Sequence, residues 1–155
     1  MKTLSYSSIG SCMLLSSKTR MGLFSAAMTM MSCAAMISGA AAQGTCATAI
    51  DLTSTPLPLG VVVSNASTAT GVSVSCYSGG GNDVWLRLPD LVAGSDYSLT
   101  TSQAGESDVT DTRLEIFHGA CGSLETIACA DDSGGSLFAD ATFTASDAGP
   151  YYVLV

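Results

Sequence analysis

The chain has 155 residues, which fits one ordinary domain. Residues 43–155 hold all thirteen acidic residues but only two basic ones, Arg87 and Arg113, and therefore carry a formal net charge of −11. So acidic a surface repels phosphate backbones, which excludes nucleic acid as a partner. It favours a soluble extracellular protein, or loops that hold hard cations.

Residues 1–42 have the pattern of an export signal. Their only charges are Lys2, Lys18 and Arg20, and the uncharged run from Met21 to Ala42 ends in three alanines. Small residues in those positions are what a signal peptidase accepts. We predict cleavage after Ala42 and a secreted or cell-surface domain over 43–155, with Met21 as an alternative start.

Two alternatives for the same segment are weaker. A transmembrane anchor needs roughly 20 apolar residues, and 21–42 is long enough, but it is rich in Ala, Ser, Gly and Met rather than Leu and Ile. A lipid-modified Cys33 fits poorly, because Met30 and Met31 precede Ser32. We therefore expect no stable membrane span after cleavage.

Four cysteines remain after cleavage: Cys46, Cys76, Cys121 and Cys129. An even number in an exported chain predicts two disulfides, and four cysteines allow three pairings. Because Cys121 and Cys129 bracket a Gly-Ser turn, we favour that pair, with Cys46 joined to Cys76. The absence of a Cys-x-x-Cys motif from the sequence argues against zinc.

From Leu59 onward the apolar residues alternate with period 2. About eight strands are predicted, around residues 59–63, 72–76, 84–88, 97–101, 112–116, 124–128, 137–143 and 151–155. Short strands separated by Gly, Asn, Asp and Ser predict an all-β fold, an antiparallel jelly-roll-like sandwich. The last predicted strand reaches Val155, so we expect the domain to be incomplete or followed by further modules.

Several motifs in order resemble a known family. They are Cys46-Ala-x-Ala-Ile, Asp83-Val-Trp, Tyr97-Ser-Leu-Thr, Asp111-Thr-Arg-Leu-Glu-Ile-Phe, Cys121-Gly-x-Leu-x-x-Ile-Ala-Cys129-x-Asp-Asp, and Gly149-Pro-Tyr-Tyr-Val. Together they resemble the bacterial pre-peptidase C-terminal-like domains. That resemblance implies a jelly-roll-like sandwich acting as a non-catalytic module of secreted proteins, with calcium in some relatives. A second, weaker resemblance is to CUB domains, through Leu114-Glu-Ile-Phe-x-Gly.

Acidic loops flank the predicted hairpin of residues 112–128. Calcium takes six to eight oxygens from carboxylates, carbonyls and water. Asp108, Asp111, Asp131 and Asp132 would meet at one end of the sandwich, and Asp83 would approach from a neighbouring loop. We therefore predict a calcium site there, although such residues also serve as turn caps that keep strand edges soluble.

Few other residues suggest a binding or catalytic role. Trp85 opposes Leu86 in phase, so it is either a binding platform for a sugar or peptide, or a core residue under a loop. His118 is a lone turn histidine, and the sequence has no Gly-x-Ser-x-Gly elbow, so we expect no catalysis. The predicted function is recognition of an extracellular polysaccharide or protein, or else service as a spacer or folding appendage beside a secreted peptidase or other hydrolase.

Overall fold

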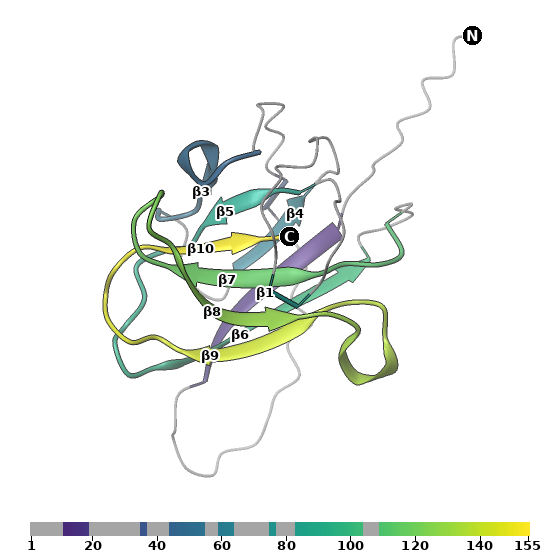
Figure 1. Ribbon diagram of the computed structural model, residues 1–155. Coiled ribbons are helices and arrows are strands. Elements are labelled where there is room, and N and C mark those ends of the chain that lie inside the picture. The colour runs from purple at the N-terminus through teal and green to yellow at the C-terminus, as the bar shows by residue number, and fades with distance from the viewer. Residues whose placement is uncertain are drawn as a thin grey trace, which may run out of the picture.

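The computed structural model is almost entirely β-structure, as the period-2 pattern predicts (Figure 1). Among the described residues, helix is limited to two short 3₁₀ turns, η1 (Cys46–Thr48) and η2 (Ser133–Gly135). The structure describes residues 11–18, 35–36, 44–54, 59–63, 75–76, 83–103 and 109–155.

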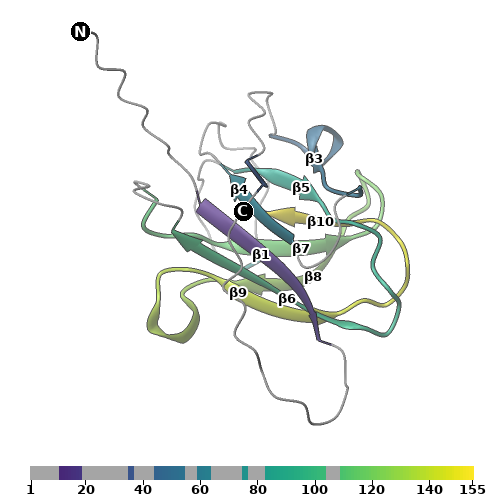
Figure 2. The same ribbon diagram turned by 180° about the vertical axis from the view of Figure 1, so that it is seen from behind.

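Two five-stranded sheets lie face to face, as the views from the two sides show (Figure 2). Sheet A has the order β2-β4-β1-β6-β9, and its strands are β2 (Ala35–Met36), β4 (Leu59–Val63), β1 (Ser11–Lys18), β6 (Asp96–Gln103) and β9 (Asp140–Thr144). Sheet B has the order β3-β5-β10-β7-β8, and its strands are β3 (Ile50–Asp51), β5 (Trp85–Arg87), β10 (Tyr151–Leu154), β7 (Leu114–His118) and β8 (Glu125–Ala130).

Neighbouring strands run antiparallel except at one edge of each sheet, where β2–β4 and β3–β5 are parallel. The predicted strands near 59, 85, 97, 114, 125, 140 and 151 are all present, with bounds shifted by a few residues. The strand predicted at 72–76 lies mostly outside the described residues, and Ser75 and Cys76 form a turn. The all-β sandwich is therefore confirmed.

The core lies between the sheets. Alternate residues of the facing strands are buried, including Leu86 of β5, Leu99 of β6, Ile116 of β7 and Val153 of β10. Each is fully enclosed, and such a side chain contributes about 1.5–3 kcal/mol on leaving water. This one-faced burial explains why the sequence alternates.

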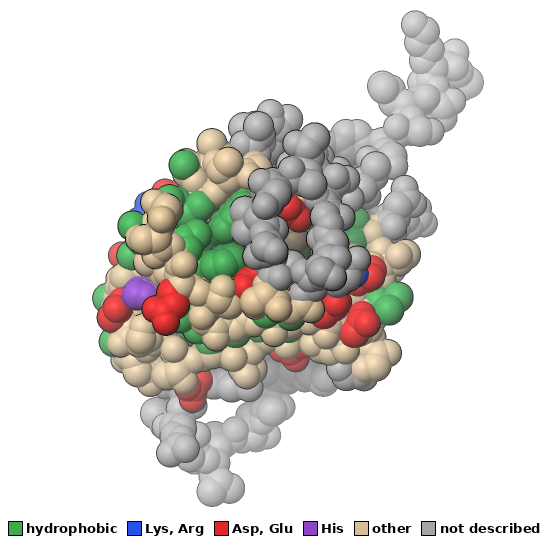
Figure 3. Space-filling model, in the orientation of Figure 1, with side chains coloured by type: hydrophobic (Ala, Val, Ile, Leu, Met, Phe, Trp, Pro, Cys, Tyr) green, Lys and Arg blue, Asp and Glu red, His purple; other side chains and the backbone are tan. Residues whose placement is uncertain are grey.

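A second, smaller cluster lies on the outer face of sheet B. It comprises Trp85, Phe117, Tyr152 and Leu154, against which Cys46, Ala49 and Leu124 pack. Hydrophobic side chains over β5 and β10 are visible on this face in Figure 3. Sheet B thus buries apolar side chains on both faces, because the segment around η1 packs against its outer side.

The disulfide pairing differs from the expected one. Cys46 is bonded to Cys121, and Cys76 is bonded to Cys129, so the two ends of the β7–β8 hairpin are each joined to an earlier segment. Cys121 and Cys129 are not partners, because they lie at different points along the hairpin: one in its turn, the other at the far end of β8. The bridges therefore anchor the covering segments to sheet B.

One strand is formed by a segment for which the sequence pattern did not predict a strand. The segment Ser11–Lys18, inside the expected signal peptide, forms β1 between β4 and β6. The uncharged run at 21–42 lies outside the described residues except for β2. No helix in the described part of the chain is long and apolar enough to cross a bilayer.

Candidate functional site

The acidic loops before β7 and after β8 leave the sandwich at the same end. Leu114, the first residue of β7, pairs with Ala130, the last residue of β8. Residues 111–113 and 131–132 therefore adjoin one another, and acidic side chains are visible at this end of the molecule in Figure 3. We call this part of the molecule the acidic end.

Three of the five predicted metal ligands meet there. The carboxylates of Asp111, Asp131 and Asp132 each offer an oxygen, and these oxygens all lie within 4.8 Å of one another. Asp111 and Asp132 are exposed, and Asp131 is half-buried. Asp132 has φ 47° and ψ 55°, a left-handed conformation that Asp tolerates better than most residues and that turns the chain from β8 into η2.

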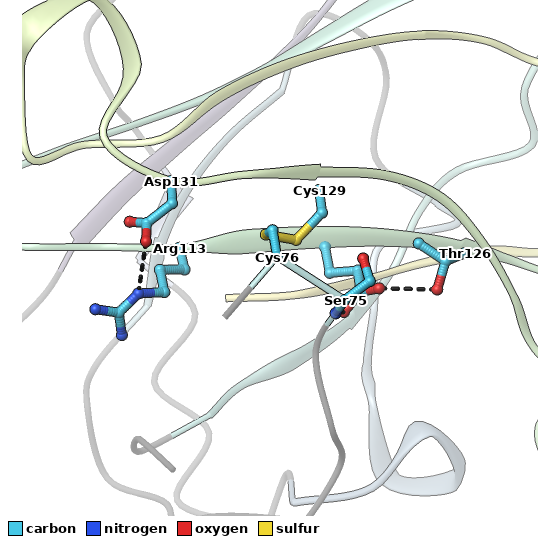
Figure 4. Close-up of a disulfide and its surroundings, with 7 residues drawn as sticks. Ser75, Cys76, Arg113, Thr126, Cys129 and Asp131 are labelled. Carbon is cyan, nitrogen blue, oxygen red and sulfur yellow. Dashed lines mark hydrogen bonds and ion pairs between the residues drawn. A yellow bond between two sulfur atoms is a disulfide. The ribbon is translucent and has the colours of Figure 1, made fainter. Parts of the chain in front are cut away.

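Arg113 lies within this cluster. Its Nε donates to Asp131 Oδ2 at 3.0 Å (Figure 4). Its terminal nitrogen is 3.7 Å from Asp111 Oδ2. Three carboxylates and one guanidinium leave a formal charge of −2 at the site. The Asp131 Oδ1 atom is buried and accepts no hydrogen bond in the structure.

These donors fit a hard divalent cation. Three carboxylates offer up to six oxygens, and Ca²⁺ prefers such oxygens, supplemented by carbonyls and water. The residual −2 charge matches the charge of the ion. The cluster is therefore a candidate calcium site.

The other two predicted ligands are not in the cluster. Asp83 is half-buried ahead of β5, at the same end of the sandwich, because the next residue, Val84, pairs with Val155 beyond β10. It is not among the clustered carboxylates. Asp108 lies outside the described residues.

Trp85 packs as a core residue and does not form an exposed platform. Its side chain is 2% exposed, and its ring centroid is 5.2 Å from that of Phe117. As predicted, Trp85 lies on the opposite face of β5 from Leu86. That outer face, however, is covered by the residues that pack against the Trp85 cluster. Tyr97, Tyr151 and Tyr152 are also buried, so none of these rings is available to stack on a sugar.

His118 makes a structural contact at the other end of β7. Its Nε2 is 3.0 Å from Asp147 Oδ1, and its ring lies 4.7 Å from the ring of Tyr151. Asp147 Oδ1 also accepts a bond from the Gly149 N–H, while the Tyr151 hydroxyl accepts one from the Ser146 N–H. This network fixes the loop before β10 and lies far along the strands from the acidic end.

Sequence reasoning missed one buried polar residue, Glu115. Its side chain is 1% exposed, and its carboxylate accepts bonds from Ser75 N–H at 3.1 Å and from the Thr126 hydroxyl at 2.8 Å (Figure 4). The period-2 alternation places Glu115 on the opposite face of its strand from Leu114 and Ile116. Nothing in the local pattern indicates that Ser75 covers it.

Comparison with known proteins gives no further guide: no protein-family model, no curated protein and no solved structure matches this chain. The protein is therefore described from its fold and its acidic cluster alone. They describe a disulfide-bonded all-β sandwich with a carboxylate cluster at one end.

Proposed function

We propose that the protein is a non-catalytic extracellular recognition module, in which calcium bound at the acidic end orders the loops that contact a partner. The observation that carries this proposal is the convergence of Asp111, Asp131 and Asp132 from the two loops that flank the β7–β8 hairpin. A cation there would hold these loops in one arrangement, which lowers the entropy cost of binding a partner.

Export is part of the proposal. Two disulfides are typical of proteins that fold in oxidising compartments, and both bridges fall within residues 43–155. The signal-like pattern of 1–42 and the resemblance to pre-peptidase C-terminal-like domains support the same conclusion.

A protein partner fits better than a polysaccharide. Carbohydrate-binding faces use exposed aromatic rings, whereas Trp85, Tyr97, Tyr151 and Tyr152 are buried. The acidic end instead offers carboxylates and the Arg113 guanidinium, which suit a basic or polar protein surface. His118 contacts Asp147 and Tyr151 and so helps to fix the loop before β10.

Calcium binding at the acidic end is tested on the exported protein. Calorimetry measures binding and thermal unfolding measures Tm, with CaCl₂ compared against MgCl₂. We expect calcium at ten times its Kd to stabilise the fold by about 1.4 kcal/mol, seen as a rise in Tm of several degrees. Asp132→Asn and Asp111→Asn should abolish that rise. Glu125→Gln, which removes an exposed charge at the opposite end of β8, should leave it intact.

A second role is favoured by the same buried rings. A sandwich in which the rings of Trp85, Tyr97, Tyr151 and Tyr152 are used in packing suits a rigid spacer or folding appendage beside a secreted peptidase or other hydrolase. If calcium has no effect on melting but deletion of the module lowers the yield of a neighbouring catalytic domain, this role replaces the first.

A further inference from the structure

A cleft on the outer face of sheet A carries an inference beyond the proposed function. It has a volume of about 310 Å³ and lies where β6 begins and β9 ends. Its described lining residues are Asp96, Tyr97, Thr142, Phe143 and Thr144. Figure 2 shows this face of the sheet, with β6 between β1 and β9. Ligand sites begin at about 300 Å³, so the cleft suits a single side chain rather than a large ligand.

One carboxylate and two hydroxyls meet at this cleft from two neighbouring strands. Asp96 is directly opposite Thr144 across the β6–β9 ladder, and Thr142 shares a face of β9 with Thr144. These three side chains are exposed, whereas Tyr97 and Phe143 bury their rings in the core beneath them. Because opposite residues of a ladder have Cβ atoms about 5 Å apart, the three polar groups can contact one small ligand group together.

The carboxylate of Asp96 is used only in part by its own sheet. The Thr144 hydroxyl donates to Asp96 Oδ1 at 2.7 Å. Both arginines of 43–155 form ion pairs with other aspartates, so within the described part of the chain neither of them neutralises Asp96. The second oxygen, Oδ2, is therefore available to a cation that comes from outside the domain.

These acceptors suit an ammonium group better than other ligands. A lysine ammonium has three diverging N–H donors, which match one carboxylate oxygen and the hydroxyl oxygens of Thr142 and Thr144. An arginine binds a carboxylate best through two parallel hydrogen bonds to both oxygens, but Thr144 already occupies one oxygen of Asp96. A sugar would stack on an exposed ring, and the rings of Tyr97 and Phe143 are buried.

The register of β1 places a lysine beside the same aspartate. Lys18, the last residue of β1, is directly opposite Asp96 on the side of β6 that faces away from β9. Residues 43–155 contain no lysine. After the expected removal of 1–42, a lysine at this position has to come from another molecule.

We propose that this cleft, which we call the Asp96 cleft, binds the ammonium group of a lysine side chain on a partner protein. The formal charge of −11 on residues 43–155 attracts a basic partner before contact. The Asp96 cleft is separate from the acidic end. Asp96 begins β6, whereas Thr101, near the other end of this strand, contacts Thr112 beside the acidic end.

The test uses the exported product of the full chain carrying Lys18→Met, so that no lysine lies opposite Asp96 whether or not 1–42 is removed. The probe is a Gly-Lys-Gly peptide blocked at both ends, in about 0.15 M salt, where the screening length is about 8 Å. Matched peptides carry norleucine or arginine in place of the lysine, and glucose tests for a sugar. NMR follows the amides of Thr142 and Thr144 and the carboxyl carbon of Asp96.

We expect the lysine peptide to shift these signals saturably with a millimolar Kd, and norleucine and glucose to leave them unchanged. The arginine peptide should bind at least about threefold more weakly. Asp96→Asn should weaken lysine binding at least about tenfold, and Thr142→Val, which removes only a hydroxyl, about threefold. The matched control is Asp140→Asn, which removes an exposed carboxylate opposite Thr100 on the same face and should change the Kd less than about twofold.

Several results would overturn the proposal. One is a folded protein, with a dispersed amide spectrum, whose signals do not respond saturably to the lysine peptide. Equal binding of the norleucine or arginine peptide, or the same shifts with glucose, would also do so. If Asp140→Asn weakens binding as much as Asp96→Asn, overall charge attracts the peptide and no site exists. The titration is made without calcium, so its result is independent of the proposed function at the acidic end.

Discussion

The carboxylate of Glu115 accepts a hydrogen bond from the backbone N–H of Ser75, forty residues earlier in the chain. The next residue, Cys76, is bonded to Cys129 of β8, the strand beside Glu115 (Figure 4). A side-chain hydrogen bond and a disulfide thus fix the same short turn against the outer face of sheet B.

The first prediction concerns this carboxylate. Glu115→Met removes both acceptors and leaves the Ser75 N–H and the Thr126 hydroxyl without a partner, so the free energy of unfolding should fall by about 1–3 kcal/mol. Glu115→Gln should cost less, because its carbonyl can accept from Ser75 while its amide donates to a reoriented Thr126 hydroxyl. Urea unfolding measures both, and equal losses for the two variants would contradict this account.

The second prediction concerns the disulfides. Peptide mapping of the exported protein without reduction should recover Cys46 linked to Cys121, and Cys76 linked to Cys129. Replacing either pair by serine should cost about 2–4 kcal/mol, because each bridge closes a long loop in the unfolded chain. Recovery of a Cys121–Cys129 peptide would show that the native pairing is different.

The third prediction concerns Trp85, the only tryptophan of the chain. Its fluorescence should resist quenching by acrylamide, because the ring is 2% exposed. Trp85→Ala should cost about 3–5 kcal/mol through the cavity it leaves. Trp85→Phe should cost less than about 1.5 kcal/mol, since the indole N–H it removes has no hydrogen-bond partner in the structure. Strong quenching of the native protein would refute burial.

The fourth prediction concerns Arg113 at the acidic end. Arg113→Gln removes the guanidinium that pairs with Asp131 and Asp111, so the formal charge there becomes −3. Without calcium, stability should fall by at most about 1 kcal/mol, because the side chain is partly exposed. The rise in Tm on adding calcium should become larger than in the wild type. Arg87→Gln, which affects only the exposed pair with Asp51, should not enlarge it.

The fifth prediction concerns acid titration of Asp51. A hydrogen bond from the Thr53 backbone N–H, 2.9 Å away, is the main reason that the pKa of this carboxyl lies below its usual value. Because the folded pKa is lowered, its contribution to stability is present above the unfolded pKa and is lost as pH falls through the folded pKa. Carbon-13 NMR titration follows this carboxyl directly. Thr53→Pro should raise the pKa of Asp51. Thr53→Ala retains the N–H but loses the side-chain hydrogen bond that also lowers the pKa, so it should raise the pKa less than Thr53→Pro does.

The sequence alone determined the class of fold and most of its strands. Alternation such as Leu114, Ile116 against Glu115 is a local consequence of the two faces of a strand, so it can be read without knowing the partners. The same holds for the four paired cysteines and for the acidic residues at the ends of β7 and β8.

Only the tertiary structure decided which partners these residues have. The bridge from Cys46 to Cys121 joins positions 75 residues apart, and the burial of Trp85 and Glu115 depends on segments that lie far from them in the chain. The role of Ser11–Lys18 as an inner strand is likewise invisible locally, because its neighbours β4 and β6 come from much later in the sequence. Periodicity specifies the faces of a strand, whereas its position in the sheet depends on pairing with distant strands, which no local pattern encodes.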